Sequence, residues 1–237
     1  MKRMPARKDK RVAIVAGVGP GLGAALVRML AGEGCSVGMF ARSAQFIGKF
    51  AAELGSNALA VPTDVSDGKQ VTAGFREVRQ QLGPVEILIA HASGSVGEGL
   101  MKTTPDQFEQ SWRVAVLGAF HCAREAVPDM LKNESGAIIF TGATSSLRGR
   151  GGAVSFSSAK FAVRGLAQSL AVELWPKGIH VAHRHHRWRD RHARGAQEIQ
   201  TFRKRTVAKA RGDRGFVLEP HSARSQRMES GDRSAAE

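Results

Sequence analysis

The 237-residue chain contains no tyrosine, although it holds eleven Phe and three Trp. Any mechanism that needs a phenol as its proton donor is therefore excluded for this chain. Cysteine is also scarce, because Cys35 and Cys122 are the only two thiols. Two distant cysteines exclude a disulfide framework and a cysteine-based zinc site, so we expect no metal and a reduced, cytoplasmic setting.

Long apolar runs are missing as well. No run approaches the roughly 20 residues that cross a bilayer, so we expect no membrane partner. The basic start, MKRMPARKDK, leads into a short apolar run that soon reaches glycines and lacks a cleavage-type ending, which argues against a targeting signal. The chain is 42 % hydrophobic and 24 % charged, the composition of one soluble globular domain with a sizeable core.

The net charge of +14 is concentrated at the two ends of the chain. Met1 to Arg11 holds six basic residues and one acidic residue, and the last 54 residues hold 14 Lys and Arg against 7 Asp and Glu. The segment between them is almost neutral. We therefore divide the chain into a basic N-terminal extension (1–10), a dinucleotide-binding domain (11–183) and a basic tail (184–237), expected to be disordered or poorly packed. Basic ends can recruit nucleic acid, but a solvated tail is the commoner explanation.

Apolar strands and amphipathic helices alternate through the first 183 residues. Strands are predicted at 12–16, 36–40, 58–61, 85–90 and 137–141, and helices at 21–31, 46–54, 69–82, 105–131 and 157–175. The strands are apolar on both sides, which is typical of a parallel sheet covered by helices. The pattern predicts an α/β fold with a Rossmann-type doubly wound sheet in a three-layer αβα sandwich, incomplete at its C-terminal edge.

A glycine-rich turn follows the first strand, from Ala16 to Gly23. Glycines at a strand-to-helix turn let the backbone approach a pyrophosphate, while the helix N-terminus offers unpaired N–H groups. The alternative is a tight turn that only packs a helix against the sheet. The position directly after an opening strand favours the dinucleotide site.

Residues 11–183 resemble the short-chain dehydrogenase/reductase family, whose loop has glycines at the spacing of Gly17, Gly21 and Gly23. Asp64 with Val65 resembles the family's Asp-Val pair, where the carboxylate accepts from the adenine amino group. Ala92 is the one match to the family's Asn-Asn-Ala-Gly in the segment 90–93. The resemblance implies cofactor-binding positions at Gly17, Gly19, Gly21, Leu22, Gly23, Arg42, Asp64, Val65, Ala92 and Lys160.

Cofactor choice is predicted from the end of the second strand. Relatives that prefer NAD present an acid there, whereas this chain has Ala41 followed by Arg42. A guanidinium can pair bidentately with the 2′-phosphate of NADP, so NADP is expected rather than NAD. A solvated surface arginine is the other explanation of Arg42.

The catalytic set of the family is largely replaced. The family uses a Tyr as general acid or base, a Ser that polarises the substrate oxygen, an Asn that supports a proton relay, and a Lys. Only Lys160 is kept, and the other three positions are Phe156, Ala143 and Ala115. Losing the proton donor is typically worth about 10²- to 10⁴-fold in rate. A bacterial branch of similar oxidoreductases also carries Phe at the Tyr position, which would make Phe156 natural there.

Other polar side chains lie near these positions in sequence. Neighbouring hydroxyls are poor acids at neutral pH and are expected to satisfy local backbone groups; they belong to Thr141, Thr144, Ser145, Ser146, Ser157 and Ser158. His91 titrates near neutrality, so we consider both a substitute acid and a structural role for it, and favour the structural role.

The pattern breaks at Arg184, where an apolar strand should continue toward a Gly and then a Thr. The sequence instead begins RHHRWRDRHAR, and zinc binding or a nucleic-acid arm are two explanations. A third is a shifted reading frame, because the same codons read one nucleotide later permit V-I-I-D-G-V-I-D-T-P, with the Gly forced by the Trp codon. Two further stretches of the tail permit family-like strings in that frame. The nucleotide sequence tests this hypothesis.

Three functions follow from these observations. The first is an NADP-dependent oxidoreductase acting on a small carbonyl or alcohol, with weak or unconventional catalysis. The second is an NADP-binding pseudoenzyme without redox turnover, and the third is nucleic-acid binding through the basic tail, which carries no recognisable motif. The family resemblance also implies a homo-oligomer, in which contacts from a lost C-terminal part would be missing.

Overall fold

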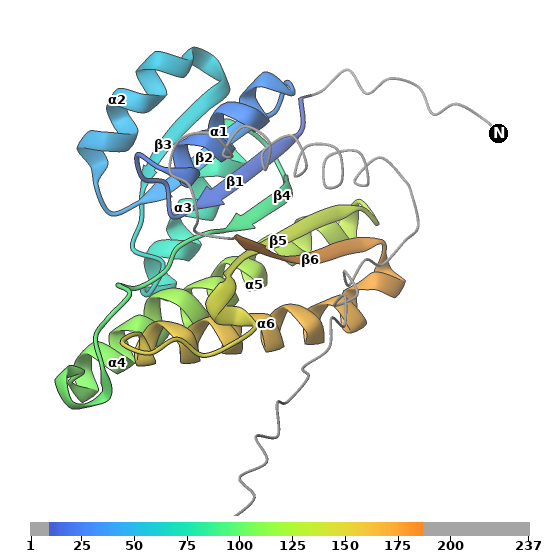
Figure 1. The fold of residues 1–237 in the computed structure, drawn as a ribbon. Coiled ribbons are helices and arrows are strands. Elements are labelled where there is room, and N and C mark those ends of the chain that lie inside the picture. The colour runs from blue at the N-terminus through green and yellow to red at the C-terminus, as the bar shows by residue number, and fades with distance from the viewer. Residues whose placement is uncertain (1–9, 187–237) are drawn as a thin grey trace, which may run out of the picture.

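The computed structural model describes residues 10–186, and its strands form one parallel sheet of six in the order β3-β2-β1-β4-β5-β6 (Figure 1). The strands are β1 (Val12–Ala16), β2 (Ser36–Ala41), β3 (Ala58–Pro62), β4 (Val85–Ala90), β5 (Gly136–Ala143) and β6 (Ile179–His186). The chain moves outward from β1 to β3, then returns to the other side of β1 at β4. This reversal confirms the predicted doubly wound topology and creates a crevice at the carboxyl ends of β1 and β4.

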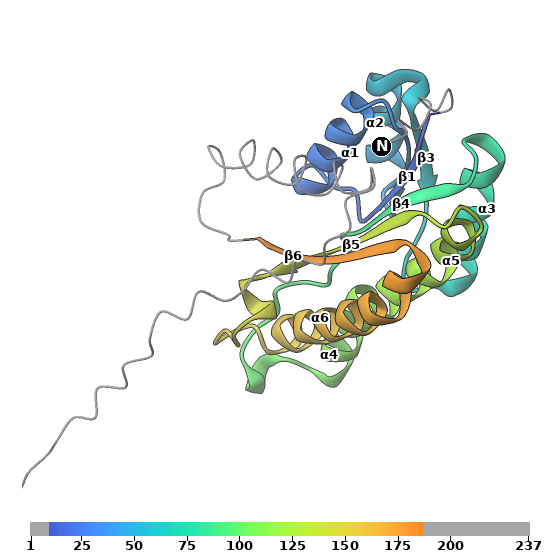
Figure 2. The same cartoon turned by 90° about the vertical axis from the view of Figure 1, so that its right-hand side faces the viewer.

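Two layers of helices enclose the sheet (Figures 1 and 2). The helices are α1 (Leu22–Gly32), α2 (Ala44–Leu54), α3 (Gly68–Gln81), α4 (Pro105–Trp112), α5 (Gly118–Lys132) and α6 (Val154–Leu174). Helices α1 and α2 lie on one face, and α3, α5 and α6 lie on the other. The three-layer αβα sandwich expected from the sequence is therefore confirmed.

The core consists of two apolar layers, one on each face of the sheet. Val12 and Ile14 of β1 pack on the side of α3 and α5, whereas Ala13 and Val15 pack on the side of α1. All four side chains are buried. Successive residues of a strand point to opposite faces, so a central strand covered by helices on both sides must be apolar throughout.

The predicted helix at 105–131 contains an irregularity that the sequence pattern does not reveal. Helix α4 begins with a capping box, in which Thr104 Oγ1 accepts from the Gln107 backbone N–H at 3.2 Å and Gln107 Oε1 accepts from the Thr104 N–H at 2.9 Å. A π-helical turn at Arg113–Leu117 then separates α4 from α5. Wider turns of this kind are often found at functional sites.

Strand β6 continues past the expected domain boundary at residue 183. It pairs with β5 as far as Ala143 opposite His186. Among the described residues β6 is an edge strand, and the charge of the half-buried Arg184 remains accessible to water there. The extension before residue 10 and the tail from residue 187 lie outside the described residues, and so do most of the positions concerned in the shifted-frame, zinc and nucleic-acid explanations.

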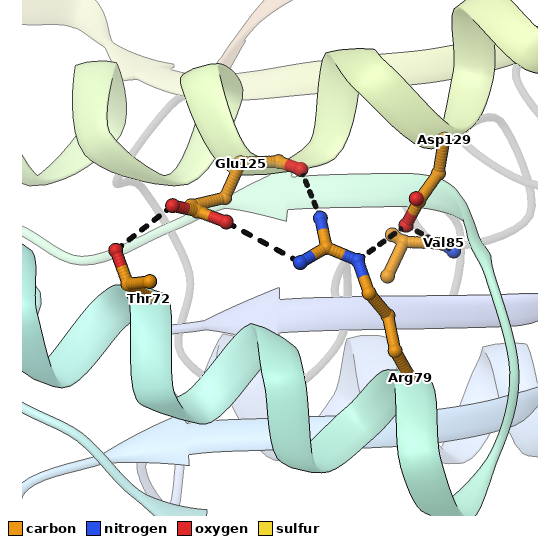
Figure 3. A network of polar contacts seen from close by, with 5 residues as sticks. All are labelled: Thr72, Arg79, Val85, Glu125 and Asp129. Carbon is orange, nitrogen blue, oxygen red and sulfur yellow. Dashed lines mark hydrogen bonds and ion pairs between the residues drawn. The ribbon is translucent and has the colours of Figure 1, made fainter.

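A polar network joins α3 to α5 at the amino end of β4 (Figure 3). Arg79 Nε donates to Asp129 Oδ2 at 2.8 Å, and its Nη2 donates to the Glu125 carbonyl at 2.5 Å. Asp129 Oδ2 also accepts from the Val85 N–H at 3.0 Å, and Thr72 Oγ1 donates to Glu125 Oε1 at 2.8 Å. The buried Asp129 carboxylate is therefore paired with a cation and hydrogen-bonded to the backbone, as a buried charge requires.

Within residues 10–186, no helix is long and apolar enough to span a membrane, and no group of His, Cys, Asp and Glu side chains is arranged to hold a metal ion.

Candidate functional site

The glycine-rich turn lies at the crevice between β1 and β4 and is held by backbone hydrogen bonds. The Gly17 N–H donates to the Phe40 carbonyl at 2.8 Å, and the Ala92 N–H donates to the Ala16 carbonyl at 2.7 Å. Gly17 has φ +104°, and a Cβ on it would lie 2.4 Å from the Ala92 backbone nitrogen. This position therefore needs glycine for two reasons, since an L side chain would be both strained and in collision with backbone.

The remaining glycines of the turn have two different roles. A Cβ on Gly23 would lie 2.8 Å from the Gly17 carbonyl oxygen, so this glycine allows α1 to pack closely against the turn. At Gly19 and Gly21, a Cβ would meet none of the described atoms within 4 Å. Their α-carbons instead border open space beside the N-terminus of α1, which starts at Leu22.

This arrangement fits a pyrophosphate. Among the described residues, no side chain caps α1 and no acidic residue occupies its first turn. Its first N–H groups and the positive end of its dipole are therefore available to an anion, at a place where two glycines leave the backbone open to close approach. The structure thus brings Gly17, Gly19, Gly21, Leu22 and Gly23 together as the sequence predicts.

Arg42 lies directly after β2, on the same carboxyl edge as the glycine turn, and is exposed. It forms no ion pair with any residue in the range 10–186. Ala41 ends β2 and offers no carboxylate at this place. Among the described residues, this edge therefore presents a guanidinium without an ion-pair partner, a group that can bind a phosphate bidentately.

Asp64 and Val65 follow β3 and form the next part of the edge. Asp64 Oδ1 accepts from the Ser66 N–H at 2.9 Å and from the Ser66 hydroxyl at 2.7 Å, so one carboxylate oxygen already fixes its own loop. The buried Val65 accepts from His121 Nδ1 through its carbonyl at 3.2 Å and packs against Gly118, where a Cβ would lie 2.7 Å from Val65 Cγ2. The second oxygen of Asp64 has no hydrogen-bond partner among the described residues and is the one that can accept from a ligand.

Lys160 projects from α6 toward the end of β5. Its side chain is buried, its Nζ donates to the Thr141 carbonyl at 2.9 Å, and it lies 5.6 Å from the centre of the Phe156 ring. Burial lowers the Lys160 pKa from 10.5 to about 8, because the charged form loses its hydration. An ammonium has three N–H donors, so the bond to Thr141 leaves donors for a ligand.

The three replaced positions all precede Lys160 in the chain, and they lie on α6 itself and on two elements that α6 contacts, β5 and the π-helical turn. Phe156 stands one helical turn before Lys160 on α6, Ala143 is the last residue of β5, and Ala115 is buried at the middle of the π-helical turn. A phenyl ring and two methyl groups have no exchangeable proton. The predicted catalytic pair therefore consists of one proton-bearing group, Lys160, and one apolar ring, Phe156.

The neighbouring hydroxyl groups are mostly engaged with the backbone, as the sequence predicts. Thr141 Oγ1 donates to the Ala90 carbonyl at 3.3 Å, and Ser158 Oγ donates to the Ser155 carbonyl at 3.0 Å. Ser146 Oγ accepts from the Ala143 N–H at 3.0 Å. These contacts lie at the end of β5, in the turn that follows it and in the first turns of α6, and they engage the hydroxyls with local backbone groups.

His91 lies within the seam between β4 and β5. Its Nδ1 is 3.0 Å from Thr141 Oγ1, and its backbone N–H donates to the Ala16 carbonyl at 2.8 Å. The same Thr141 hydroxyl also contacts the Ala90 carbonyl, so His91, Thr141 and the end of β4 are joined by hydrogen bonds. This geometry supports the structural role that the sequence favours, since the ring ties the two strands together beside Lys160.

Sequence reasoning missed Trp112. Its Nε1 donates to Ser158 Oγ at 3.0 Å and so connects α4 to the turn of α6 that carries Phe156. The two residues are 46 positions apart, and no periodicity or motif links them. The only available signal was that Trp112 lies three residues before Ala115, the position where the family has its Asn.

Comparisons with known proteins give one matching family model and several relatives of similar sequence. The family model of the short chain dehydrogenases matches residues 11–184. The chain is 31 % identical over 176 residues to the meso-2,3-butanediol dehydrogenase of Serratia marcescens, covering 74 % of this chain and 70 % of the relative. It is 33 % identical over 168 residues to the 3-oxoacyl-acyl-carrier-protein reductase MabA of Mycobacterium tuberculosis, covering 69 % of this chain and 63 % of the relative.

Two solved structures share the fold. A short-chain dehydrogenase from Rhodopseudomonas palustris has a TM-score of 0.74 at 32 % identity and covers 82 % of this chain and 90 % of that one. A 3-ketoacyl-(acyl-carrier-protein) reductase from Brucella melitensis, complexed with NADH, has a TM-score of 0.71 at 26 % identity and covers 74 % of each chain. The match to MabA spans less than two thirds of that reductase's length.

Proposed function

The chain belongs to the short chain dehydrogenase family, and on that premise we propose that it binds NADP(H) along the carboxyl edge of the sheet and acts as an oxidoreductase on a small carbonyl or alcohol compound. The family and the NADH complex of the Brucella melitensis reductase support a nicotinamide cofactor. The choice of NADP rests on Arg42. The observation that carries the proposal is that the open, uncapped glycine turn, Arg42 and Lys160 all lie along the carboxyl edge of the sheet.

Each part of the cofactor has a place on this edge. The pyrophosphate is held by Gly19, Gly21 and the N-terminus of α1, and Arg42 pairs with the 2′-phosphate. Asp64 accepts from the adenine amino group through its second carboxylate oxygen. Lys160 donates to the ribose hydroxyls beside the nicotinamide, which supplies or takes up a hydride when it is bound.

Proton transfer is the step for which this chain differs from the family pattern. Phe156 gives shape and an apolar surface but no proton, so reduction of an ordinary ketone should be slower by about 10²- to 10⁴-fold than with a phenol at that place. Phe156 also motivates a second candidate function, an NADP-binding protein without redox turnover. NADPH binding without consumption, in a broad screen of carbonyl compounds, would favour that candidate.

The cofactor assignment is tested by titrating the full chain with NADPH and with NADH and following fluorescence. NADPH should bind more tightly than NADH. Arg42→Ala should weaken NADPH binding by roughly 10- to 100-fold and change NADH binding little, since a charged hydrogen bond contributes about 1.5–3 kcal/mol. Lys49→Ala is the matched control, because Lys49 is an exposed cation on α2 away from the edge. Equal losses for both nucleotides in Arg42→Ala would contradict the NADP assignment.

We also propose that copies of the chain pair through α5 and α6. These helices expose several large apolar side chains, among them Phe120 at 42 %, Phe161 at 42 % and Val172 at 77 %. Exposed apolar patches of this kind commonly mark interfaces. Light scattering should report a dimer or larger assembly, and Val172→Glu should shift it toward the monomer; a monomeric parent protein would refute the proposal.

A further inference from the structure

Lys160 is a buried cation without a counter-ion among the described residues. Only two charged side chains in the described residues are buried, Asp129 and Lys160. Asp129 forms an ion pair with Arg79 at 2.8 Å, whereas Lys160 has none within residues 10–186. A buried ammonium without a partner is costly, and an anion placed beside it would remove much of that cost.

Lys160 lies beside an aromatic ring, and the loop that precedes its helix is basic. Its Nζ uses one donor on the Thr141 carbonyl, and the half-buried Phe156 ring lies beside it, 5.6 Å from Nζ to the ring centre. The loop between β5 and α6 adds Arg148 and Arg150, both exposed, and contains no acidic residue. Glu98 contacts the start of α6, but through its backbone carbonyl, and its side chain is exposed. The place thus combines an aromatic face with a positive charge, and the residue at the family's phenol position, Phe156, bears no exchangeable proton.

These features discriminate between carbonyl compounds by the basicity of the anion that hydride addition creates. An isolated ketone gives an alkoxide about as basic as hydroxide, whose parent acid has a pKa near 15.7, so it needs a proton as it forms. A quinone gives the anion of a hydroquinone, which is a phenol with a pKa near 10. The second anion is roughly six orders of magnitude less basic and can persist beside an ammonium until water supplies its proton.

We propose that this site reduces quinones, with the planar ring lying against Phe156 and the developing phenolate oxygen facing Lys160. The proposal rests on the proposed function, since the reductant is a reduced nicotinamide dinucleotide. That cofactor gives up one hydride, the quinone gains the two electrons and one hydrogen as a hydroquinone monoanion, and the monoanion takes a proton from water. A phenol acid is not needed at any stage.

The test uses the full chain with NADPH and two bicyclic substrates, 1,4-naphthoquinone and the isolated ketone 1-tetralone, with the rate in the absence of protein subtracted. The quinone should react at least 100-fold faster than the ketone. Phe156→Tyr restores a phenol and should raise the rate of 1-tetralone reduction by about 10²-fold or more. The preference for the quinone, which is the ratio of the two rates, should therefore fall. Phe108→Tyr places the same hydroxyl at an exposed position of α4 and should leave the preference for the quinone unchanged.

An equilibrium measurement gives a second readout. In the presence of NADP⁺, the phenol 1-naphthol should bind at least tenfold more tightly than 1-methoxynaphthalene, which cannot form an anion. Lys160→Met, measured at NADP⁺ concentrations that saturate this variant, should abolish that difference, and Lys49→Met should not. Retention of the tenfold difference in Lys160→Met would overturn the assignment of Lys160.

The outcomes separate the two proposals. NADPH binding together with equal rates for the two substrates, or with no quinone reduction, would overturn the quinone assignment and leave the cofactor assignment standing. Failure to bind NADPH or NADH would overturn the proposed function, and the quinone assignment with it.

Discussion

Replacement of Lys160 by methionine should stabilise the protein at neutral pH, although it removes a hydrogen bond. The side chain is 5 % exposed, and burial lowers its pKa to about 8 from 10.5. Between these two values the unfolded chain binds more protons at this site than the folded chain, so the free energy of unfolding rises with pH through that window. Below pH 8 the folded protein carries the full cost of the buried charge.

The magnitude follows from the two pKa values. The gap between about 8 and 10.5 corresponds to roughly 3 kcal/mol at 1.36 kcal/mol per pKa unit. Methionine fills a similar volume but loses the bond from Nζ to the Thr141 carbonyl, worth about 1 kcal/mol. We therefore expect Lys160→Met to be more stable than the parent by about 2 kcal/mol at pH 7, and this advantage to disappear by about pH 10.

Urea unfolding of the nucleotide-free protein, followed by tryptophan fluorescence at several values between pH 7 and pH 10, measures this difference. Comparison of the two proteins is essential, because burial also raises the Cys122 pKa to about 12. The unfolded chain releases that thiol proton at lower pH, so stability falls above about pH 8.5 in both proteins and the effect cancels in the difference. A difference that stays constant from pH 7 to pH 10 would refute the reasoning.

Three other predictions concern stability and accessibility. Asp129→Ala leaves a guanidinium and a backbone amide without their acceptor and should lower the free energy of unfolding by about 3 kcal/mol. Glu109→Ala breaks an exposed ion pair and should change that free energy by less than about 1 kcal/mol. Similar losses for the two variants in urea unfolding would contradict this prediction. Gly17→Ala should cost more than about 2 kcal/mol and abolish nucleotide binding, because the new methyl group meets the Ala92 backbone at a positive φ; a variant with parental melting temperature would show that the turn can relax. The Cys122 thiol, fully buried with a raised pKa, should not react with iodoacetamide at pH 8 until urea unfolds the chain, and mass spectrometry of the native protein checks this.

The fold could be predicted from the sequence because its information is local. Strand β1 and the glycine turn carry both the apolar run and the spacing that define them, and the structure confirms their bounds. The start of α6 was placed at Ser157 but lies at Val154, since the glycines before it obscure the beginning of the helix. The π-helical turn at Arg113–Leu117 has the same apolar content as a regular helix and leaves no distinct pattern.

The candidate site was predictable only in part. The glycines and Lys160 were found through spacing, which depends on the backbone of one turn or one helix. The contact of His91 with Thr141 joins residues 50 positions apart, and the network of Arg79 with Asp129 does the same. Such pairs depend on which strands and helices become neighbours, and a single sequence does not encode that in any short motif.

The polar network of Figure 3 has a consequence for protein engineering. It stands at the amino end of β4, and the nucleotide edge stands at the carboxyl ends of the strands, so the groups that fasten the helices share no side chain with those that would meet a ligand. Distant substitutions tend to act independently. The substitutions Ala115→Asn, Ala143→Ser and Phe156→Tyr can therefore be combined without altering the polar network that joins α3 to α5. This makes the chain a convenient background for rebuilding a proton relay one group at a time.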